Sequence, residues 1–214
     1  MKTERPLRAA VLLSGGGRTL ENLIKRRDQG GLAVEFTGVI SSRKNVRGVD
    51  VARAAGIPCD ILSRKSHASD ESFSTAVTEA ILKAPPDIVL MAGFLSLYLM
   101  PRDWIGRVVN IHPSLLPLFG GKGFYGHHVH EAVLASGMRV SGCTVHYVDT
   151  EFDHGPVIHQ RACTVLPSDD ADTLAARVFA EECEALPAAL EWIRRGWVRY
   201  EAGRTVYAPE FRPG

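Results

Sequence analysis

The sequence lacks three features that would each define a class of protein: paired cysteines, an excess of one charge, and a long apolar run. Its cysteines, Cys59, Cys143, Cys163 and Cys183, include no CxxC pair, which argues against a disulfide framework or a zinc site. We expect small buried side chains in a reducing compartment. The formal net charge is +1, so no electrostatic reason favours a nucleic acid or an anionic membrane as partner.

Segments that enter or cross a membrane are also missing. No apolar run reaches the roughly 18 residues that a membrane span needs. The first eight residues are polar, and the apolar segment after them is only as long as a strand, so a secretory signal is not expected. A chain of 214 residues can bury a large core, and we expect a cytoplasmic protein.

One apolar run, from Val108 to Ile111, contains an asparagine and is followed by a histidine and then by Pro113. If this run is a strand, Asn110 and His112 project to the same side. An amide can donate to a developing oxyanion, and an imidazole can donate or accept a proton during acyl transfer. The alternative is a strand-end pair that makes only local hydrogen bonds.

A second candidate site follows the first apolar run. Residues 8–13 lead into Ser14-Gly15-Gly16-Gly17-Arg18-Thr19, and helical periodicity begins at Leu20. A glycine-rich turn between a strand and a helix can bring backbone N–H groups to a phosphate. The spacing matches neither GxGxxG nor a P-loop, so a merely flexible connection is the alternative.

Strand and helix patterns alternate through the first half of the chain. The strand-like runs are residues 8–13, 34–40, 58–62, 88–92 and 108–111. This alternation predicts an α/β fold with a doubly wound, mostly parallel sheet. In such sheets ligands bind beyond the carboxyl ends of the strands, where the glycine turn, residues 93–98 and the Asn110/His112 pair all lie.

The second half has a different pattern. Helices or strands are expected at residues 127–136, 142–148, 156–166, 170–194, 197–200 and 205–207. They predict a C-terminal antiparallel extension and a long helix, which Pro187 should kink or interrupt. The glycine-rich loop 120–126 is expected to be mobile or shaped by a ligand. The acidic linker 149–155 could bind a ligand or merely provide solubility.

Three histidines, His127, His128 and His130, resemble a metal cluster. Adjacent residues point in different directions on a helix, and no i, i+4 histidine pair exists here, so we expect solvated or capping side chains. The chain also has no GxSxG motif and no plausible Cys/His pair. The chemistry that remains is direct attack of a substrate amine on an acyl donor, assisted by Asn110, His112 and a carboxylate of the acidic linker.

The stretch Asn110-Ile111-His112-Pro113-Ser114-Leu115-Leu116-Pro117 resembles the signature of the formyltransferases that use 10-formyltetrahydrofolate. Further matches in order and spacing are Leu13-Ser14-Gly15-x-Gly17, Ala92-Gly93-Phe94, Gly142-x-Thr144-Val145-His146, Asp153-x-Gly155-Pro156-Val157-Ile158, and a helix with Arg177, Val178 and Glu182. The resemblance covers nearly the whole chain. It implies a Rossmann-like formyltransferase domain over residues 1–214, with a nucleotide-phosphate-binding half at 1–107 and a catalytic and folate-binding half at 108–214.

The resemblance also implies a role for each site residue. Asn110 would hold the formyl oxygen, His112 would be the general acid, and Asp153 would keep His112 protonated. The residues expected to bind glycinamide ribonucleotide are Gly17, Arg18, Thr19 and Glu182. Those expected to bind the folate are Leu95, Ser96, Leu97, Tyr98, Asn110, Thr150, Glu151 and Asp153. The folate is a co-substrate, no metal is implied, and the expected partners are small molecules, with a monomer or a homodimer as the assembly.

The chain departs from the family pattern at three places. Arg18-Thr19 replaces a polar Ser-Asn pair, and Arg18 could add a phosphate contact. Ser96 and Asp70 stand where arginines associated with folate binding are frequent, and Lys122 is a candidate replacement for them.

Four other functions predict different sequence features. A formyltetrahydrofolate hydrolase would carry an extra N-terminal domain, whereas the first strand is expected by about Arg8. A methionyl-tRNA formyltransferase would carry a C-terminal barrel and a basic surface, which the net charge of +1 does not favour. A sugar-nucleotide formyltransferase fits the glycine turn and Glu182 less well. A non-catalytic binding protein would not need Asn110, His112 and Asp153 together.

Overall fold

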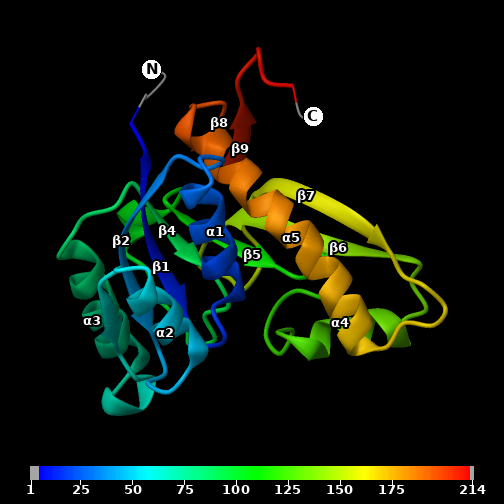
Figure 1. The fold of residues 1–214 in the computed structure, drawn as a ribbon, viewed down its shortest axis with the longest axis horizontal. Coiled ribbons are helices and arrows are strands. Elements are labelled where there is room, and N and C mark those ends of the chain that lie inside the picture. Colours follow the sequence, from blue (N-terminus) through cyan, green and yellow to red (C-terminus); the bar gives the residue numbers. More distant parts are fainter. Residues whose placement is uncertain (1–4, 213–214) are drawn as a thin grey trace. The chain divides into compact units, whose positions relative to one another are not determined.

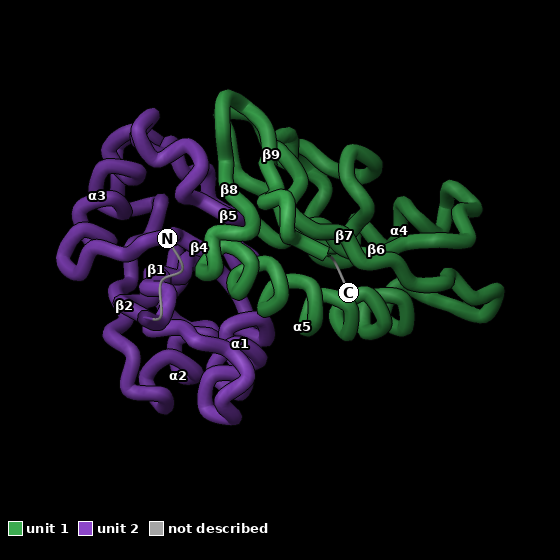
Figure 2. Tube along the Cα trace, turned by 90° about the horizontal axis from the view of Figure 1, so that it is seen from above, with its two compact units in different colours: residues 1–3, 110–214 green, residues 4–109 purple. Residues whose placement is uncertain are grey.

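The computed structural model describes residues 5–212, so the first four residues of the polar N-terminal segment lie outside the described part. Within it the chain forms two compact units, residues 5–109 and residues 110–212. Figure 1 shows the elements of both units along the chain, and Figure 2 colours the two units separately. We call them the N-terminal and the C-terminal unit.

The N-terminal unit is a parallel sheet with helices in the connections. Its elements are β1 (Leu7–Leu13), α1 (Arg18–Asp28), β2 (Val34–Ser41), α2 (Arg47–Ala54), β3 (Cys59–Ile61), the 3-10 turn Arg64–Ser66, α3 (Asp70–Leu82), β4 (Ile88–Met91) and the 3-10 turn Arg102–Trp104. The strands lie in the order β3-β2-β1-β4 and each neighbouring pair is parallel. These elements occupy the positions that the sequence periodicity predicts, with ends that differ by a few residues.

Burial explains why these runs are strands. The β1 side chains from Ala9 to Leu13 are almost completely inaccessible, as expected for a strand that is covered on both faces by crossover helices (Figure 1). The start of α3 carries a cap formed by two serines. Ser69 accepts from the Ser72 backbone N–H, and the Ser72 hydroxyl accepts from the backbone N–H of Ser69, a reciprocal cap that satisfies two donors at the helix start.

The C-terminal unit combines an antiparallel pair with two helices and a small hairpin. After β5 (Val108–His112), which begins in the N-terminal unit, come α4 (His127–Ala135), β6 (Val140–Tyr147), β7 (Val157–Thr164), α5 (Ala171–Arg194), β8 (Val198–Glu201) and β9 (Arg204–Tyr207). β6 pairs antiparallel with β7, and β8 with β9 in a separate sheet. The seven-stranded order is β3-β2-β1-β4-β5-β6-β7. The predicted doubly wound, mostly parallel sheet with a C-terminal antiparallel extension is confirmed.

Pro187 does not interrupt α5, which is continuous from Ala171 to Arg194, so that part of the prediction is wrong. A proline inside a helix costs about 3 kcal/mol. The helix buries Leu174, Val178 and Leu186 among other apolar side chains, and each contributes about 1.5–3 kcal/mol. Burial therefore outweighs the local cost.

The cysteines are free thiols, and only Cys143 is fully buried, whereas the other three are half-buried. The expectation that all four are buried is therefore wrong for three of them, which lie where their elements meet solvent. Among the helices of residues 5–212, none is long and apolar enough to cross a membrane.

Candidate active site

Three of the predicted site residues come together in the C-terminal unit. Asn110 and His112 alternate along β5, and Asp153 lies in the loop between β6 and β7. The Asn110 Nδ2 atom is 3.3 Å from Asp153 Oδ1, and His112 Nδ1 is 3.5 Å from Asp153 Oδ2. The side chains of His112 and Asp153 are 5% and 14% exposed. Because alternate residues of a strand project to the same side, the Asn110 amide and the His112 imidazole both lie next to the Asp153 carboxylate.

Both ring nitrogens of His112 face oxygen atoms that act as hydrogen-bond acceptors. Nε2 lies 2.8 Å from the carbonyl oxygen of Phe119, so it donates there. Nδ1 faces the Asp153 carboxylate at ion-pair distance. Both ring nitrogens of His112 therefore have a hydrogen-bond or ion-pair partner within the cluster.

The glycine-rich loop contributes directly to this cluster. The Gly121 backbone N–H donates to Asp153 Oδ2 at 3.0 Å. A Cβ atom on Gly120 would lie 2.5 Å from Leu116 Cδ2 and 3.2 Å from the Asp153 Cβ. Asp153 itself has a left-handed backbone, with φ of 55°, which carboxylate and amide residues tolerate better than most. A larger residue at position 120 would therefore displace the Leu116 side chain and crowd the candidate carboxylate.

His146 is a member of the cluster that the sequence reasoning did not assign to the site. It lies on β6 with a side chain that is 2% exposed, and its Nε2 is 3.1 Å from Asn110 Nδ2. Its Nδ1 is 2.9 Å from the Tyr147 carbonyl oxygen. Burial lowers the pKa of His146 below its ordinary value of 6.5. The alternation of Thr144 and His146 within one motif was the signal that could have identified it.

Thr144, two residues before His146, holds the stretch that follows β5. Its hydroxyl donates to the Ser114 carbonyl at 2.7 Å and accepts from the Leu116 backbone N–H at 3.0 Å. The side-chain amide of Gln160 on β7 donates to the same hydroxyl. The chain between Ser114 and Leu116 is therefore tied to β6 and β7 next to the cluster.

The prediction for the three histidines of α4 is correct for two of them. His127 and His128 are exposed, but His130 is buried with no hydrogen-bond partner at Nδ1. With Val129 and Val133 it forms the buried face of α4, so helical periodicity places it inside. Burial, with smaller contributions from His127 and His112, lowers the pKa of His130 to about 4. Within residues 5–212, no group of three or more His, Cys, Asp or Glu side chains could hold a metal ion.

In the N-terminal unit, the glycine turn leads into α1 as predicted. Gly17 precedes the first helical residue and has φ of 70°, and Arg18 and Thr19 begin the helix. A Cβ on Gly17 would lie 2.6 Å from the Gly48 Cα atom. Glycine is thus required here both by the left-handed backbone and by the close approach of α2. The helix N-terminus that follows favours an anion.

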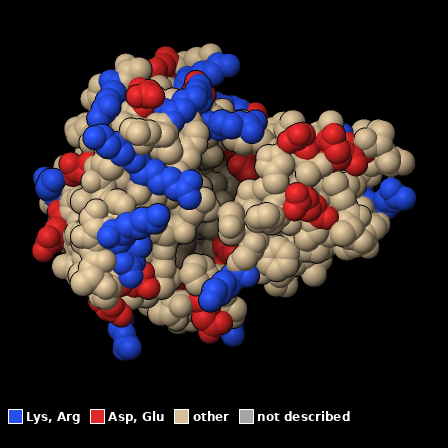
Figure 3. All heavy atoms as spheres, turned by 90° about the horizontal axis from the view of Figure 1, so that it is seen from below, with Lys and Arg blue, Asp and Glu red and all other residues tan. Residues whose placement is uncertain are grey.

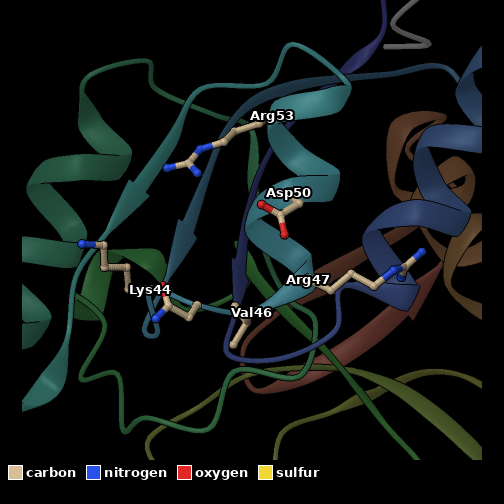
Figure 4. Close-up of a pocket in the computed structure, with 6 residues that line it drawn as sticks. Lys44, Val46, Arg47, Asp50 and Arg53 are labelled. Carbon is tan, nitrogen blue, oxygen red and sulfur yellow. The ribbon is translucent and has the colours of Figure 1, made fainter.

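Arg47 ties this turn to α2. Its guanidinium donates to the Gly16 carbonyl at 3.2 Å and pairs with Glu21 at 2.5 Å. Figure 4 shows Arg47 turned toward α1, whereas Arg53 and Lys44 point to the other side. These side chains line a surface hollow formed by Lys44, Asn45, Val46, Arg47, Asp50 and Arg53. The hollow has no partly buried acid or base comparable to Asp153 or His112.

Charged side chains of both signs occur on the face of the molecule drawn in Figure 3. Figure 3 shows Lys and Arg side chains that gather on one part of the face in view, with Asp and Glu side chains among and beyond them. The exposed arginines near the glycine turn are partly neutralised by acidic neighbours such as Glu21.

The predicted folate segment Leu95–Tyr98 follows β4 in the same unit. The Leu95 backbone N–H donates to the Ser14 hydroxyl at 2.9 Å, and the Ser14 and Ser42 hydroxyls are 2.5 Å apart. Ser14 thus joins this segment to the end of β1, directly before the glycine turn. Tyr98 is buried and its hydroxyl lies 2.9 Å from Thr78 Oγ1. Burial raises the pKa of Tyr98 to about 12, so this side chain anchors the segment.

The remaining predicted residues are more accessible. Thr150 and Glu151 are exposed in the loop that carries Asp153, and Glu182 is half-buried on α5. Asp70 pairs with Arg64 at 2.5 Å.

The chain belongs to the formyl transferase family, whose profile matches residues 7–190. The resemblance drawn from the motifs is thereby confirmed. This defines the class of protein in which the Asn110, His112 and Asp153 cluster lies.

Individual relatives are named more specifically. The chain is 39% identical over 206 residues to the trifunctional purine biosynthetic protein adenosine-3 of Bos taurus. This match covers 95% of this chain and 20% of that protein. It is 40% identical over 183 residues to the chloroplastic phosphoribosylglycinamide formyltransferase of Vigna unguiculata. This match covers 84% of this chain and 58% of that protein. The chain therefore spans less than two thirds of the length of either relative.

A solved structure resembles the whole chain. The structure of glycinamide ribonucleotide transformylase 1 from Symbiobacterium toebii matches with a TM-score of 0.88 at 32% sequence identity. The match covers 96% of this chain and 95% of that one. The likeness extends through both units of the fold.

Proposed function

We propose that this chain is a phosphoribosylglycinamide formyltransferase. It transfers the formyl group of 10-formyltetrahydrofolate to the glycinamide amine of N1-(5-phospho-D-ribosyl)glycinamide, a step of de novo purine biosynthesis. The products are the formylglycinamide ribonucleotide and tetrahydrofolate. Family membership and the names of the relatives support this reaction, and the buried cluster of Asn110, His112 and Asp153 is the observation that carries it.

In the proposed mechanism the substrate amine attacks the formyl carbon directly. The carbonyl electron pair moves to oxygen, and Asn110 donates a hydrogen bond to the resulting oxyanion. When the tetrahedral intermediate collapses, the carbon–N10 bond breaks and His112 donates its proton to the departing nitrogen. The surplus proton of the attacking amine returns to His112, so no proton is gained or lost overall. Asp153 stabilises the imidazolium between turnovers.

The proposed domain covers residues 1–214, with a nucleotide-phosphate-binding half at 1–107 and a catalytic and folate-binding half at 108–214. Gly17, Arg18 and Thr19 bind the ribose phosphate, where a glycine turn opens α1, and Glu182 binds the glycinamide part. The folate contacts residues 95–98, Asn110 and the loop that carries Thr150, Glu151 and Asp153. No metal takes part in this mechanism.

The proposed partners are these small molecules only, and the assembly is a monomer or a homodimer. We place the reaction in the cytoplasm, which agrees with four free thiols. Neither a nucleic acid nor a membrane is needed for the reaction.

The test is to mix the protein with 10-formyltetrahydrofolate and to follow tetrahydrofolate release with and without glycinamide ribonucleotide. Release that requires the nucleotide, together with formylated nucleotide as product, is expected. Release at the same rate without the nucleotide would indicate a hydrolase instead. Binding of both ligands without release would indicate a non-catalytic binding protein.

A further inference from the structure

Asn110 can serve the reaction only if the nitrogen of its amide, and not the oxygen, faces the site. Nothing in β5 itself decides this, because the two orientations of a carboxamide have nearly the same shape. The neighbours must therefore select one of them. Two atoms contact Asn110 Nδ2: Asp153 Oδ1 at 3.3 Å and His146 Nε2 at 3.1 Å.

Hydrogen bonds connect the Tyr147 carbonyl, His146, Asn110 and Asp153 in series. The acceptors at the two ends of this series determine the direction of each hydrogen bond in it. The Tyr147 carbonyl oxygen can only accept, so His146 Nδ1 carries the proton that it receives. A neutral imidazole then has a bare Nε2, which accepts from Asn110 Nδ2. At the other end, the ionised Asp153 carboxylate also accepts. Both hydrogens of the Asn110 amide are thus engaged, one by each neighbour.

The two acceptors of Asn110 differ in how many other donors they have. Asp153 also receives the Gly121 N–H at 3.0 Å and faces His112 Nδ1 at 3.5 Å. His146 Nε2 has Asn110 as its one hydrogen-bond donor among the described contacts. The contact of Asn110 Nδ2 with Asp153 is longer than its contact with His146, and the Asp153 carboxylate also has other donors. It is therefore the contact that can be released when another acceptor arrives.

We infer that His146 is a positioning residue for formyl transfer, because it holds one Asn110 N–H permanently and leaves the other free to move between Asp153 and the formyl oxygen. This inference rests on the proposed function. In the empty site Asp153 takes the second N–H. In the loaded site the formyl oxygen accepts the second N–H of Asn110. Asp153 then no longer accepts from Asn110, and its carboxylate interacts with His112.

The role requires that His146 remain neutral. A proton on Nε2 would make that atom a donor, and the amide of Asn110 would have to turn its oxygen toward it. The same turn would bring Asn110 Oδ1 toward the Asp153 carboxylate, where two acceptors repel. The charged groups that act on His146 are Asp153 and Asp149 in the loop after β6 and His112 on β5. The two carboxylates favour the protonated form, whereas burial and His112 oppose it, and burial is the largest effect.

Two substitutions separate positioning from simple packing. In His146→Gln the side-chain oxygen reaches about as far as Nε2 and can accept from Asn110, but it does not titrate. In His146→Leu no acceptor remains, and the amide of Asn110 is free to turn. We expect kcat to fall about 10²-fold in His146→Leu, the scale of a misplaced catalytic group, with KM for both substrates nearly unchanged. We expect kcat within about fivefold of the unsubstituted protein in His146→Gln, since one hydrogen bond is worth about 1 kcal/mol.

The pH profile provides a readout that packing alone would not change. The acid limb of kcat/KM should include a group with a pKa below 6.5, and this component should be absent from His146→Gln. His159→Gln is the matched control. His159 lies on β7 against the Trp192 ring, with centroids 4.5 Å apart, and burial also lowers its pKa. That variant should keep both kcat and the acid limb.

A measurement without substitution tests the same inference. Nitrogen-15 NMR of the histidine rings at pH 7 should report His146 as the neutral form with its proton on Nδ1. A proton on Nε2, or equal kcat for His146→Leu and the unsubstituted protein, would overturn the inference. If the unsubstituted protein fails to form formylated nucleotide, the proposed function fails instead. Thermal unfolding of each variant shows whether a lost activity reflects a lost fold.

Discussion

The two candidate binding regions are built in opposite ways. The cluster around Asn110, His112 and Asp153 consists of side chains that are largely shielded from water and whose hydrogen bonds have forced directions. The glycine turn before α1 consists of backbone groups beside exposed ion pairs, such as Arg47 with Glu21. Interactions between shielded charges are strong, and exposed ion pairs contribute little. We therefore expect substitutions to affect catalysis in the first region and substrate binding in the second.

The largest effect is expected for the cluster itself. His112→Ala and Asp153→Ala should each lower kcat by about 10² or more, the scale of general-acid catalysis, while KM for both substrates changes little. Steady-state kinetics with thermal unfolding as the control for folding checks this. A nearly unchanged kcat in either variant would overturn the proposed roles.

Burial in the same unit also predicts a dependence of stability on pH. His130 has a pKa of about 4 in the folded chain and about 6.5 when unfolded, so the unfolded state binds more protons between these values. Stability should therefore fall as pH decreases from about 6.5 to 4, by on the order of 3 kcal/mol from this group. Urea unfolding at several pH values measures the slope.

The matched pair of variants for this prediction lies on one helix. His130→Leu should flatten the decline in stability at acidic pH, because the group that titrates is removed. His128→Gln, at an exposed position of α4, should leave the decline unchanged. Identical slopes in all three proteins would show that His130 does not cause the effect.

An intermediate effect is expected at the glycine turn. In Gly17→Ala a Cβ would have to occupy a left-handed backbone, which costs about 1–2 kcal/mol, and would meet the Gly48 Cα atom. KM for glycinamide ribonucleotide should rise about tenfold, with kcat within a few-fold. Gly16→Ala is the control, because a Cβ there meets no atom within 4 Å.

Gly120→Ala sharpens the contrast between the two regions. Its Cβ would push on Leu116 and on Asp153, so this variant should lower kcat rather than raise KM for the nucleotide. The two alanine variants are chemically identical changes in the two regions. If both affected the same kinetic constant, the distinction between a catalytic and a binding region would not hold.

The smallest effect is expected at Lys122, an exposed residue of the glycine-rich loop. If it contacts the glutamate tail of the folate, Lys122→Ala should raise KM for polyglutamylated donors a few-fold, since an exposed ion pair contributes about 0.2–1 kcal/mol. KM for the monoglutamylated donor should not change. Equal values for both donors in the variant and the unsubstituted protein would exclude this role.

Much of the fold was predictable because strands and helices have different periods. The alternation of apolar strands and amphipathic helices predicts the parallel sheet of the N-terminal unit. The continuity of α5 through Pro187 was not predictable, because a local rule does not include the burial of the surrounding side chains.

The site was predictable in part for the same reason. The i, i+2 spacing of Asn110 and His112 was sufficient to place them on one side of β5. Their approach to Asp153, 43 positions along from Asn110, came only from the family resemblance. The exposure expected of His130 was wrong, because His130 lies three residues before Val133 and so shares the buried face of α4.

The sequence by itself determined the order of strands and helices along the chain and the placement of an amide and an imidazole on one strand. Local geometry decides each of these, because strand and helix periods act over a few residues. Only the tertiary structure decided that His146 on β6 accepts from Asn110, that Phe119 and Asp153 face the two nitrogens of His112, and which histidines are buried. Proton positions depend on the partners that folding brings within hydrogen-bond distance, and on the water that it removes.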